Sequence, residues 1–351
     1  QFGGDYATSF SHYISKAERF DGTSWSEVAN MNKGRSQLAG IGTTDSSLAV
    51  AGNPTPGGHA PGNAFDVEEW NGSNWTAVQS TLAAPYLNSG IAGAGTVNDA
   101  LAYGGYSYEP TAPSTTRENK TQYYDGTAWT YGNLLITGRN GLAGNGLTGG
   151  GDAYAAGGTT PTTVSCTEHY TVNYVTASFG KVEAKAITGE TCTLTNVVPV
   201  AFANGISGRI SGSAQLPDIS GSFNKGFEHT GDIRTAKGVW SSGGNLVVPR
   251  KQMAGSGIQN AALATGGSQI NYGNAYTECS EEYNGTSWSE GNDLITNRKL
   301  HTQVGTQNAS LIIGGWNTLT NTEEYNGTNY ATAAALSQGG YAKIGFGVQN
   351  A

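Results

Sequence analysis

Acidic and basic side chains recur at a fixed spacing along this chain of 351 residues. Two such pairs lie 17 residues apart, Glu18 with Arg35 and Glu281 with Arg298, and at the same spacing the neutral Gln122 precedes Arg139. A carboxylic acid with a guanidinium as its electrostatic partner can serve acid–base catalysis. A catalytic group is rarely needed once in every repeat, however. The repetition therefore favours a structural pair or hydrogen bond beneath surface loops.

The sequence has none of the common catalytic or metal-binding motifs, such as HExxH, GxSxG, a Walker loop or an EF-hand. No two histidines form an i, i+2 or i, i+4 pair; they are His12, His59, His169, His229 and His301. The glycine-rich run at residues 144–151 is explained by strand turns rather than by phosphate binding. We therefore predict a protein that is not an enzyme, with no catalytic residue, no metal and no cofactor.

The three cysteines are predicted to be free thiols. Cys166 and Cys279 each precede a strand tyrosine by four residues, so they occupy equivalent positions in two repeats. Such positions are expected to be too far apart for the roughly 4.4–6.8 Å between Cα atoms of a disulfide. Cys192 lies in a different segment, and the spacing of the three is not that of metal ligands.

A hairpin motif repeats along the chain. Residues 281–288 (EEYNGTSW) contain an aromatic residue, Asn-Gly and a second aromatic residue, and near-copies lie at 18–25, 69–75, 123–129 and 324–330. Asn or Asp followed by Gly tolerates the positive φ angles of a type I′ turn. Each copy is therefore predicted to be a tight β-hairpin.

A second motif follows each hairpin after about 17 to 25 residues. Residues 305–315 (GTQNASLIIGG) suggest a small-residue strand, a turn and an apolar strand closed by Gly-Gly. Relatives lie at 257–267 and 95–105, with weaker copies at 42–52 and 146–158. Together the two motifs give four short strands in a unit of roughly 50 residues, which cannot bury both faces alone. Such units stack as propeller blades.

The units resemble kelch repeats, whose pattern combines an Arg, a Gly-Gly doublet, Glu-x-Tyr and a later Trp. The arginines in the matching position are Arg35, Arg139, Arg250 and Arg298. The pattern departs in the second unit, where Tyr86 replaces Arg, and in the last, where Gln338 replaces Arg and Tyr330 replaces Trp. The resemblance covers nearly the whole chain outside one insertion and implies an all-β, kelch-like β-propeller.

Both ends of the chain resemble incomplete units. Residues 2–4 look like the end of a second strand, and residues 345–351 like a first strand and its turn. The Gly-Gly doublets and their equivalents number six, at 3–4, 51–52, 104–105, 157–158, 266–267 and 314–315. We predict six blades, closed by pairing of the N- and C-terminal strands, which removes open sheet edges.

The fourth unit is interrupted. Trp129 and Trp240 lie 111 residues apart, about one unit plus some 60 residues. The predicted domains are therefore a propeller at 1–174 and 239–351 and a β-rich insertion at 175–238, within the outer hairpin. The insertion has few large apolar residues for its length, which favours a docking element that contacts a partner through Phe179, Phe223 and Phe227. The alternative is a tolerated surface insertion.

Loops between the second and third strands are predicted to emerge on one face and to carry a binding surface. The candidates are Tyr6, Tyr13, His59, Phe65, Tyr106, Tyr108, Tyr272, Tyr276 and Trp316. Aromatic rings with polar neighbours suit stacking on sugars or packing against a protein. The alternative is that several of them only cover blade ends.

The composition excludes some partners. Only 13% of residues are charged, against about 25% in an average domain, and such a neutral, glycine-rich surface is typical of extracellular and virion β-structures. A net charge of −8 argues against nucleic-acid binding. No apolar run approaches the ~20 residues that span a bilayer, so no membrane insertion is expected. The first residue is Gln, so we expect a chain processed or cut from a longer one.

Phrases rich in Gly, Ser and Phe at residues 178–180 and 221–227, with the degenerate kelch-like units, resemble virion proteins of marine bacteriophages. The resemblance implies a non-enzymatic structural or adhesive protein of the phage tail or particle surface, within a larger oligomeric assembly. Its expected partners are other virion proteins and a host-surface glycan or receptor, and its expected location is the virion. The alternative is a secreted sugar-binding or sugar-converting kelch propeller.

Overall fold

The computed structural model describes residues 3, 14–53, 66–78, 82, 90–107, 116–146, 152–172, 238–269, 275–317, 319–345 and 347. Residues 1–173 and 237–351 form one compact unit, and residues 174–236 form a second, which lies wholly outside the described residues. Every regular element in the described part is a β-strand.

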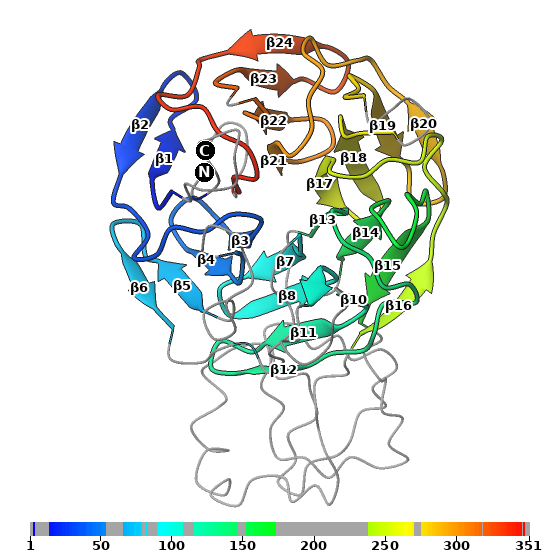
Figure 1. Cartoon of the computed structure of the whole chain (residues 1–351), viewed down its shortest axis with the longest axis horizontal. Helices are drawn as coiled ribbons and strands as arrows, with labels where there is room; N and C mark the ends of the chain where they lie inside the picture. The colour runs from blue at the N-terminus through cyan, green and yellow to red at the C-terminus, as the bar shows by residue number, and fades with distance from the viewer. Residues whose placement is uncertain are drawn as a thin grey trace, which may run out of the picture. The chain divides into compact units, whose positions relative to one another are not determined.

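Five four-stranded antiparallel sheets stand around a common axis, each with its first strand innermost and its fourth outermost (Figure 1). We name each blade by its first strand. From first to fourth strand, the β3 blade contains β3–β6 (Ala39–Gly42, Ser47–Val50, Val67–Trp70, Trp75–Ala77), and the β7 blade contains β7, β8, β11 and β12 (Ala92–Thr96, Asp99–Tyr103, Thr121–Tyr124, Trp129–Tyr131). The β13 blade contains β13–β16 (Ala143–Asn145, Tyr154–Ala156, Thr167–Thr171, Val239–Ser242), and the β17 blade contains β17–β20 (Ala254–Ile258, Ala261–Thr265, Ser280–Tyr283, Trp288–Glu290). The β21 blade contains β21–β24 (Thr302–Gly305, Ser310–Ile313, Thr322–Tyr325, Tyr330–Ala333). This arrangement is a β-propeller.

A two-stranded sheet occupies the remaining sector of the ring. It consists of β1 (Ala17–Phe20) and β2 (Trp25–Val28), which lie between the β21 and β3 blades (Figure 1). Phe20 packs in one apolar cluster with the β21 blade, and Ala17 in another with the β3 blade. The described residues therefore form five four-stranded sheets, not the six that the repeats predict. The terminal strands expected to complete this sheet fall largely outside the described residues.

Six outer hairpins carry the aromatic motif, and in each one two aromatic rings face each other across the strand pair. The ring centroids lie 4.5 to 5.4 Å apart in the pairs Phe20–Trp25, Trp70–Trp75, Tyr124–Trp129, Tyr170–Trp240, Tyr283–Trp288 and Tyr325–Tyr330. Such offset contacts add to the burial of both rings. The predicted hairpins are therefore present.

The turn type predicted for these hairpins is wrong. Tyr283 pairs with Trp288, so four residues form the loop, and Gly285 has a φ of 90° whereas Asn284 is not left-handed. The Asn284 side-chain oxygen instead accepts the backbone N–H groups of Thr286 and Ser287, both at 2.9 Å. An Asx-type bond thus replaces the second positive φ of a type I′ turn.

Small residues on the inner strands allow neighbouring blades to approach closely. A Cβ atom added to Gly144 would lie 2.5 Å from the hydroxyl oxygen of Tyr103, and one on Gly255 would lie 2.4 Å from that of Tyr154. The Tyr103 hydroxyl donates to the Tyr154 carbonyl at 2.7 Å, and the Tyr154 hydroxyl to the Ser256 carbonyl at 2.9 Å. Each tyrosine therefore ties one blade to the next.

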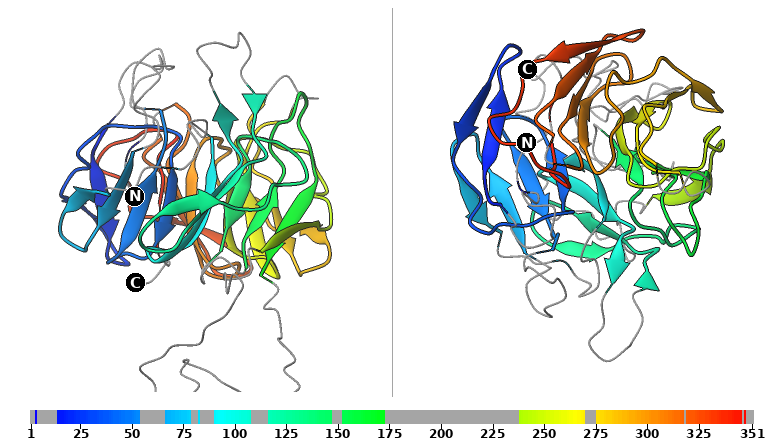
Figure 2. Two further views of the ribbon diagram at one scale, coloured as in Figure 1. Left: turned by 90° about the horizontal axis from the view of Figure 1, so that it is seen from below. Right: turned by 45° about the horizontal axis from the view of Figure 1, so that its top comes forward.

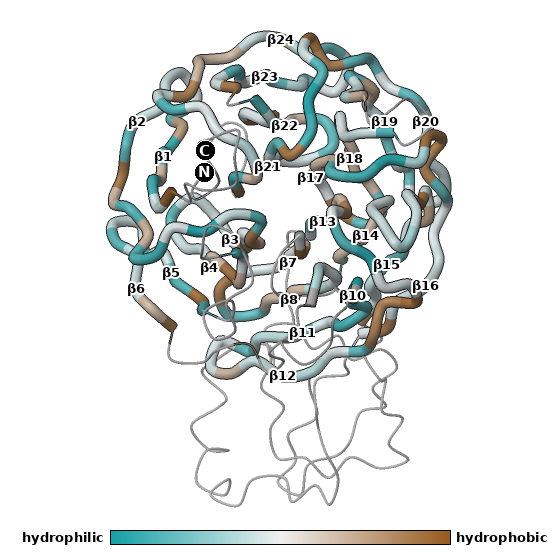
Figure 3. Tube along the Cα trace, viewed as in Figure 1, coloured by the Kyte–Doolittle hydropathy of each residue, from teal (hydrophilic) through white to brown (hydrophobic). Residues whose placement is uncertain are grey.

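The core lies between the blades rather than at one centre. Hydrophobic segments recur in every sheet around the ring (Figure 3), and one buried cluster joins Ile41 and Leu48 of the β3 blade to Tyr124 and Trp129 of the β7 blade. Both faces of each inner sheet are covered in this way, as expected for stacked repeats.

The β13 blade contains the interruption. β15 and β16 pair directly, with Thr171 opposite Val239, although residues 172–238 join them. The docking residues predicted in the insertion, Phe179, Phe223 and Phe227, lie outside the described residues. The function assigned to them stays a prediction.

Candidate functional site

One face of the propeller combines the loops between second and third strands with the connectors that lead into each first strand. We call it the loop face. Connector and loop pair through isolated bridges, which join Ser36 to Asn53 and Lys251 to Ser268. The short ribbon of β9 (Tyr106–Ser107) and β10 (Thr116–Arg117) projects from the loop face (Figure 2).

Buried ion pairs lie directly beneath the loop face. Arg250 Nη2 donates to Glu281 Oε1 at 2.8 Å, and its Nη1 donates to the carbonyls of Gly266 and Cys279 at 2.9 and 2.7 Å. The two side chains are 0% and 1% exposed. Glu281 also accepts the backbone N–H of Val247 at 2.6 Å. The pair therefore fixes a connector and a loop onto their own blade.

The same arrangement occurs in three other blades, so the structural interpretation of the arginines holds but the predicted partners are wrong. The equivalent buried pairs are Arg35–Glu68, Arg139–Glu168 and Arg298–Glu323. Each arginine enters a blade and pairs with the glutamate on that blade's third strand. The 17-residue spacing instead joins residues of neighbouring blades. Burial lowers the pKa of Arg35 and Arg298, and the attraction of their glutamates opposes this shift.

A closed ring of backbone hydrogen bonds surrounds the axis at the loop face. Its six residues all have φ between 52° and 65°; they are Gln37, Gly90, Gly141, Gln252, Leu300 and Ala342. The N–H of each donates to the carbonyl of the preceding one at 2.7 to 3.2 Å, and Gln37 donates to Ala342 to close the circle. We call this the hub ring. Because every member both donates and accepts, the left-handed backbone is stabilised at non-glycine residues as well.

The two-stranded sector has a different cation beneath the hub ring. Gly340 stands two residues before Ala342, where four of the other five connectors place arginine, so the assignment of Gln338 to the arginine position is wrong. Lys343 Nζ instead lies 4.0 Å from Glu18 Oε2 and donates to the Gln338 carbonyl at 2.6 Å. Burial lowers the pKa of Lys343 to about 8, against the attraction of Glu18. The position of Tyr86 lies outside the described residues.

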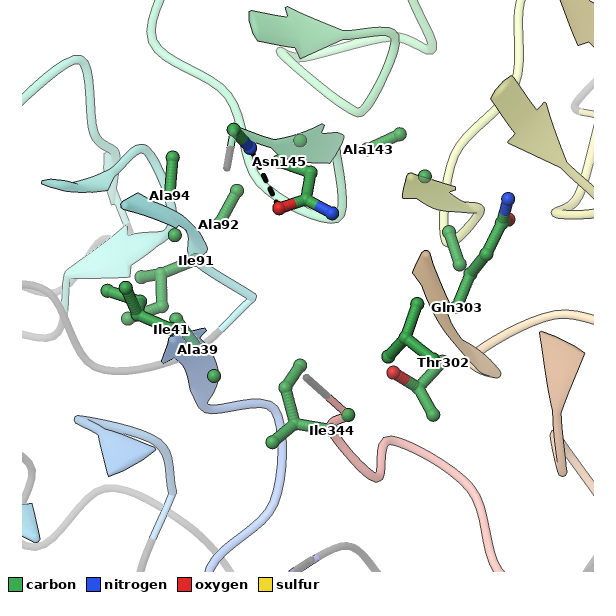
Figure 4. A pocket seen from close by; sticks show the side chains of 18 of the residues that line it. Ala39, Ile41, Ile91, Ala92, Ala94, Ala143, Asn145, Thr302, Gln303 and Ile344 are labelled. Atoms are coloured by element: carbon green, nitrogen blue, oxygen red, sulfur yellow. Dashed lines mark hydrogen bonds between the residues drawn. The ribbon is translucent and has the colours of Figure 1, made fainter. Parts of the chain in front are cut away.

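A cavity of about 160 Å³ lies along the axis. Its lining comes mainly from the five inner strands and from Ile344, Gly345 and Gly347, and most of it is Ala, Gly and Ile (Figure 4). Ligand pockets usually measure about 300–1,000 Å³. Among the described residues no carboxylate, lysine or arginine lines this cavity. The cavity therefore suits a few water molecules better than a sugar or a cofactor.

His301 is a buried titratable group that sequence reasoning missed. It is 6% exposed, and burial, together with the charges of Arg298 and Arg250, places its pKa well below the ordinary value. The Thr265 hydroxyl donates to Gln303 Oε1 at 2.6 Å, so His301 Nε2, at 2.9 Å from that hydroxyl, must donate to it. Neutral His301 thus carries its proton on Nε2 and links the β17 and β21 blades.

Three of the nine predicted binding residues are described: Tyr106, Tyr276 and Trp316. Those outside the described residues are Tyr6, Tyr13, His59, Phe65, Tyr108 and Tyr272. Tyr106 lies in the β9–β10 ribbon, where the guanidinium carbon of Arg117 stands 5.5 Å from its ring centroid. Tyr276 and Trp316 belong to a separate site.

Tyr276 and Trp316 meet around Lys299. The Lys299 ammonium lies 4.7 Å from the centroid of the Tyr276 ring and 5.0 Å from that of Trp316. Trp316 in turn packs on the buried ring of Tyr341 at 4.5 Å. Burial and the nearby charge of Lys251 lower the pKa of Lys299. We call these residues the lysine–aromatic cluster; its two lysines were missed by sequence reasoning.

Other candidate chemistry is sparse in the described part of the chain. Cys166 and Cys279 are free thiols, and their carbonyls accept from Arg139 and Arg250. No group of three or more His, Cys, Asp or Glu side chains gathers there in a way that could hold a metal ion. Within the same residues, no helix is long and apolar enough to cross a bilayer.

Comparison with known proteins shows the fold. The structure of YjhT resembles this one with a TM-score of 0.53 and 12% sequence identity, over 94% of this chain and 97% of YjhT. The chain shares the β-propeller fold. No family model and no curated protein matches the sequence. At this level of identity the likeness extends to the architecture alone.

Proposed function

We propose that this protein is a non-enzymatic recognition module, a structural and adhesive component of the tail or surface of a bacteriophage particle. In this role the loop face contacts a host-surface glycan or receptor, and the insertion docks onto another virion protein. The observation that carries the proposal is the lysine–aromatic cluster, in which Tyr276 and Trp316 flank a half-buried amine on the loop face. Partly exposed aromatic rings on surface loops are typical of recognition sites.

The proposal includes a six-bladed, kelch-like ring. Gly3 supports it, because its φ of 66° and its bond to the Lys16 carbonyl match those of Gly104 and its bond to Lys120. The hub ring supports it as well, since its six members are consecutive around the axis. In this proposal residues 344–347 supply the inner strand of the sixth blade and the N-terminal residues supply the next one.

The packing of residues 344 and 345 also favours this closure. A Cβ atom on Gly345 would lie 2.7 Å from Val304, and one on Gly40 would lie 3.0 Å from Ile344. The same contact joins Gly93 to Ile41 in the next blade, at 2.6 Å. Ile344 and Gly345 thus stand between β21 and β3 as an inner strand does elsewhere in the ring.

Recognition accounts for the buried charges better than catalysis does. Each arginine beneath the loop face is bonded to a glutamate and to backbone carbonyls, and Glu281 accepts two N–H groups besides its arginine. Groups satisfied in this way hold loops in place and have little freedom to exchange protons with a substrate. The proposed role of these pairs is to give the loop face a fixed shape.

A direct test combines the particle and the purified chain. Immunogold labelling with an antibody against the chain is expected to mark the tail or surface of virus particles from the source sample. The purified protein, incubated with simple sugars and followed by NMR, is expected to leave them unchanged. Turnover of a sugar, with no labelled particle, would favour the alternative of a secreted sugar-converting propeller.

The docking role of the insertion has its own test. Thr171 and Val239 face each other across β15 and β16, so the two ends of the segment lie side by side. Replacing residues 174–236 by Asn-Gly is therefore expected to leave a folded propeller, with an unchanged circular dichroism spectrum, that no longer assembles into particles. A variant that fails to fold would show that the segment belongs to the core.

A further inference from the structure

We propose that the joint between the β17 and β21 blades is a pH-sensitive switch, which is closed while the imidazole of His301 is neutral and opens when that ring takes up a second proton. The joint goes beyond the proposed function and does not depend on it. The lysine–aromatic cluster spans the same two blades, because Tyr276 belongs to a loop of the β17 blade and Trp316 to a loop of the β21 blade. Opening the joint would therefore also separate the two rings on the loop face.

The residue that follows each member of the hub ring is buried at a joint between two blades. A Cβ atom added to Gly104 would lie 3.2 Å from the Leu142 side chain, and one added to Gly266 would lie 2.8 Å from the His301 ring. Both side chains thus pack on the first glycine of a Gly-Gly doublet in the preceding blade. The six residues at this position, all between 1% and 7% exposed, are Leu38, Ile91, Leu142, Met253, His301 and Lys343. The first four are apolar, whereas His301 and Lys343 can titrate and flank the β21 blade (Figure 1).

A chain of hydrogen bonds crosses this joint and holds the imidazole in its neutral form. His301 Nε2 donates to the Thr265 hydroxyl at 2.9 Å, and that hydroxyl donates to Gln303 Oε1 at 2.6 Å. Gln303 Nε2 in turn donates to the hydroxyls of Ser256 and Ser310, at 2.8 and 3.0 Å. The chain therefore links strands of both blades. Its direction places the single imidazole proton on Nε2, so a second proton would enter at Nδ1, which is buried as well.

Positive charge already surrounds this ring. Arg298 precedes His301 in the same connector, and Arg250 lies in the connector of the β17 blade; both side chains are 0% exposed. Arg250 Nη1 donates at 2.9 Å to the carbonyl of Gly266, the residue on which the His301 ring packs. Burial, and then the charges of the two arginines, hold the pKa of His301 well below its ordinary value. A protonated ring would thus be a third cation in a buried space.

The carboxylates at this joint are already bonded. Glu281 accepts from Arg250 and from two backbone N–H groups, and Glu323 accepts from Arg298 and from two others. The structure therefore places both acids on the arginines rather than on His301. An imidazolium that forms here loses less by opening the joint to water than by staying buried among like charges.

The direction of the pH effect follows from linkage. Because the folded pKa of His301 is lowered, the unfolded or opened chain binds more protons below a pH of about 6.5, the ordinary value for histidine. The closed joint is fully stable above that pH and loses stability as the pH falls below it, by about tenfold in the equilibrium constant per pH unit. Lys343, whose pKa is about 8, is charged on both sides of this window. In acid the β21 blade would therefore have a buried cation at both of its joints.

The first test is urea unfolding of wild type and His301→Met at pH 7.5, 6.5, 5.5 and 5.0. Methionine is the residue at the same position in the preceding connector, Met253. The ratio of folded to unfolded protein, taken relative to the variant, is expected to fall in wild type by about 30-fold between pH 7.5 and 5.0. His301→Gln keeps an N–H donor for Thr265 but cannot titrate, so it should behave as His301→Met does and serves if the methionine variant is unstable. A difference that stays constant with pH would overturn the switch.

His169→Gln is the matched control. His169 is the other histidine in the described part of the chain; it is half-buried on β15, and burial lowers its pKa as well. Its removal is expected to leave the pH-dependent difference between wild type and His301→Met unchanged. If His169→Gln abolished that difference, the acid sensitivity would not belong to His301.

The second test asks whether the joint opens locally. Hydrogen exchange, corrected for its intrinsic pH dependence, is compared between residues 302–313 of the β21 blade and residues 39–50 of the β3 blade. At pH 5.0 the protection of 302–313 is expected to fall about tenfold or more below that of 39–50 in wild type, and not in His301→Met. An equal fall in both blades would overturn the local joint, because acid would then weaken the whole ring.

Discussion

Two sectors of the ring meet the same structural demand with different cations. In the β21 blade the guanidinium of Arg298 pairs with Glu323 and also donates to the carbonyls of Gly314 and Asn321. In the β1–β2 sector the ammonium of Lys343 lies 4.0 Å from Glu18 and donates to one carbonyl. Both cations are buried.

The difference shows what the arginine contributes. A planar guanidinium has five donors and can bind a carboxylate and two carbonyls at once, whereas an ammonium is a compact charge with a high desolvation cost. Gly340 occupies the arginine position in this sector. The cation is instead supplied by Lys343, three residues further along the chain. We therefore expect the β1–β2 sector to be the weakest seam of the ring.

The largest effect should come from breaking an arginine-anchored blade. Arg298→Met would leave Glu323 buried without its cation and the Gly314 carbonyl without its side-chain donor, whereas the Asn321 carbonyl would keep the backbone N–H of Gly314. Removing one partner of a buried pair costs about 3–5 kcal/mol. The free energy of unfolding, measured by urea denaturation, is expected to fall by that amount.

Arg117→Met is the control for that measurement. Arg117 is half-buried and stands over the Tyr106 ring on the β9–β10 ribbon. It makes no ion pair with a described residue. Its loss is expected to cost about 1 kcal/mol or less. If the two variants were equally stable, the buried pairs would not be what holds the blades.

The pH dependence of stability should reveal Lys343. Its pKa is about 8 in the folded protein against 10.5 for an ordinary lysine. Between these values the unfolded chain binds more protons than the folded one, so stability rises with pH. At about 1.4 kcal/mol per pH unit, the rise reaches about 3 kcal/mol by pH 10.5. Urea unfolding at pH 7.5, 8.5 and 9.5 measures it.

The variant Lys343→Met separates the pH dependence that comes from Lys343 from the pH dependence that comes from the tyrosines. Burial raises the pKa of Tyr170 to about 12, so that residue lowers stability only as the pH rises above about 10. It does so in both proteins. The difference in unfolding free energy between wild type and variant should therefore grow across the window. A constant difference would mean that Lys343 titrates normally.

The two sectors also show which features of the fold could be predicted from the sequence. The glycines, hairpins and arginines repeat locally, so blade architecture could be read from spacing. The partner of each arginine could not, because Arg250 and Glu281 are brought together by strand order within a blade. Lys343 was missed for a related reason, since its equivalence emerges only from the hub ring through Ala342.

The candidate site was predicted only in part. Tyr276 and Trp316 were chosen as aromatic residues on variable loops, and the structure brings them together. Lys299 was not predicted to belong to a site, because a lysine on its own carries no sequence signal. It becomes notable only when stacking of the β17 and β21 blades places two rings beside it.

An intermediate effect is expected from the packing of inner strands. A Cβ atom on Gly255 would lie 2.4 Å from the buried hydroxyl of Tyr154, which is hydrogen-bonded to the Ser256 carbonyl, whereas the nearest atom to one on Gly40 would be a methyl carbon of Ile344 at 3.0 Å. Gly255→Ala is expected to cost about 1–3 kcal/mol through overpacking. Gly40→Ala should cost less. If Gly40→Ala lowered the thermal unfolding temperature more than Gly255→Ala, the β1–β2 sector would not be the weakest part of the ring.

The smallest effect at neutral pH should come from Lys343→Met. Two contributions oppose each other: the variant loses the attraction to Glu18 and the bond to Gln338, but it no longer buries an ammonium whose pKa is already lowered by desolvation. Glu18 keeps its bond from the Ser337 N–H at 3.0 Å. Replacing a buried charge by an apolar side chain is often nearly neutral, so the change at pH 7 is expected to stay within about 1 kcal/mol. A loss as large as that of Arg298→Met would show that the β1–β2 sector depends on its cation as strongly as the four arginine-anchored blades do.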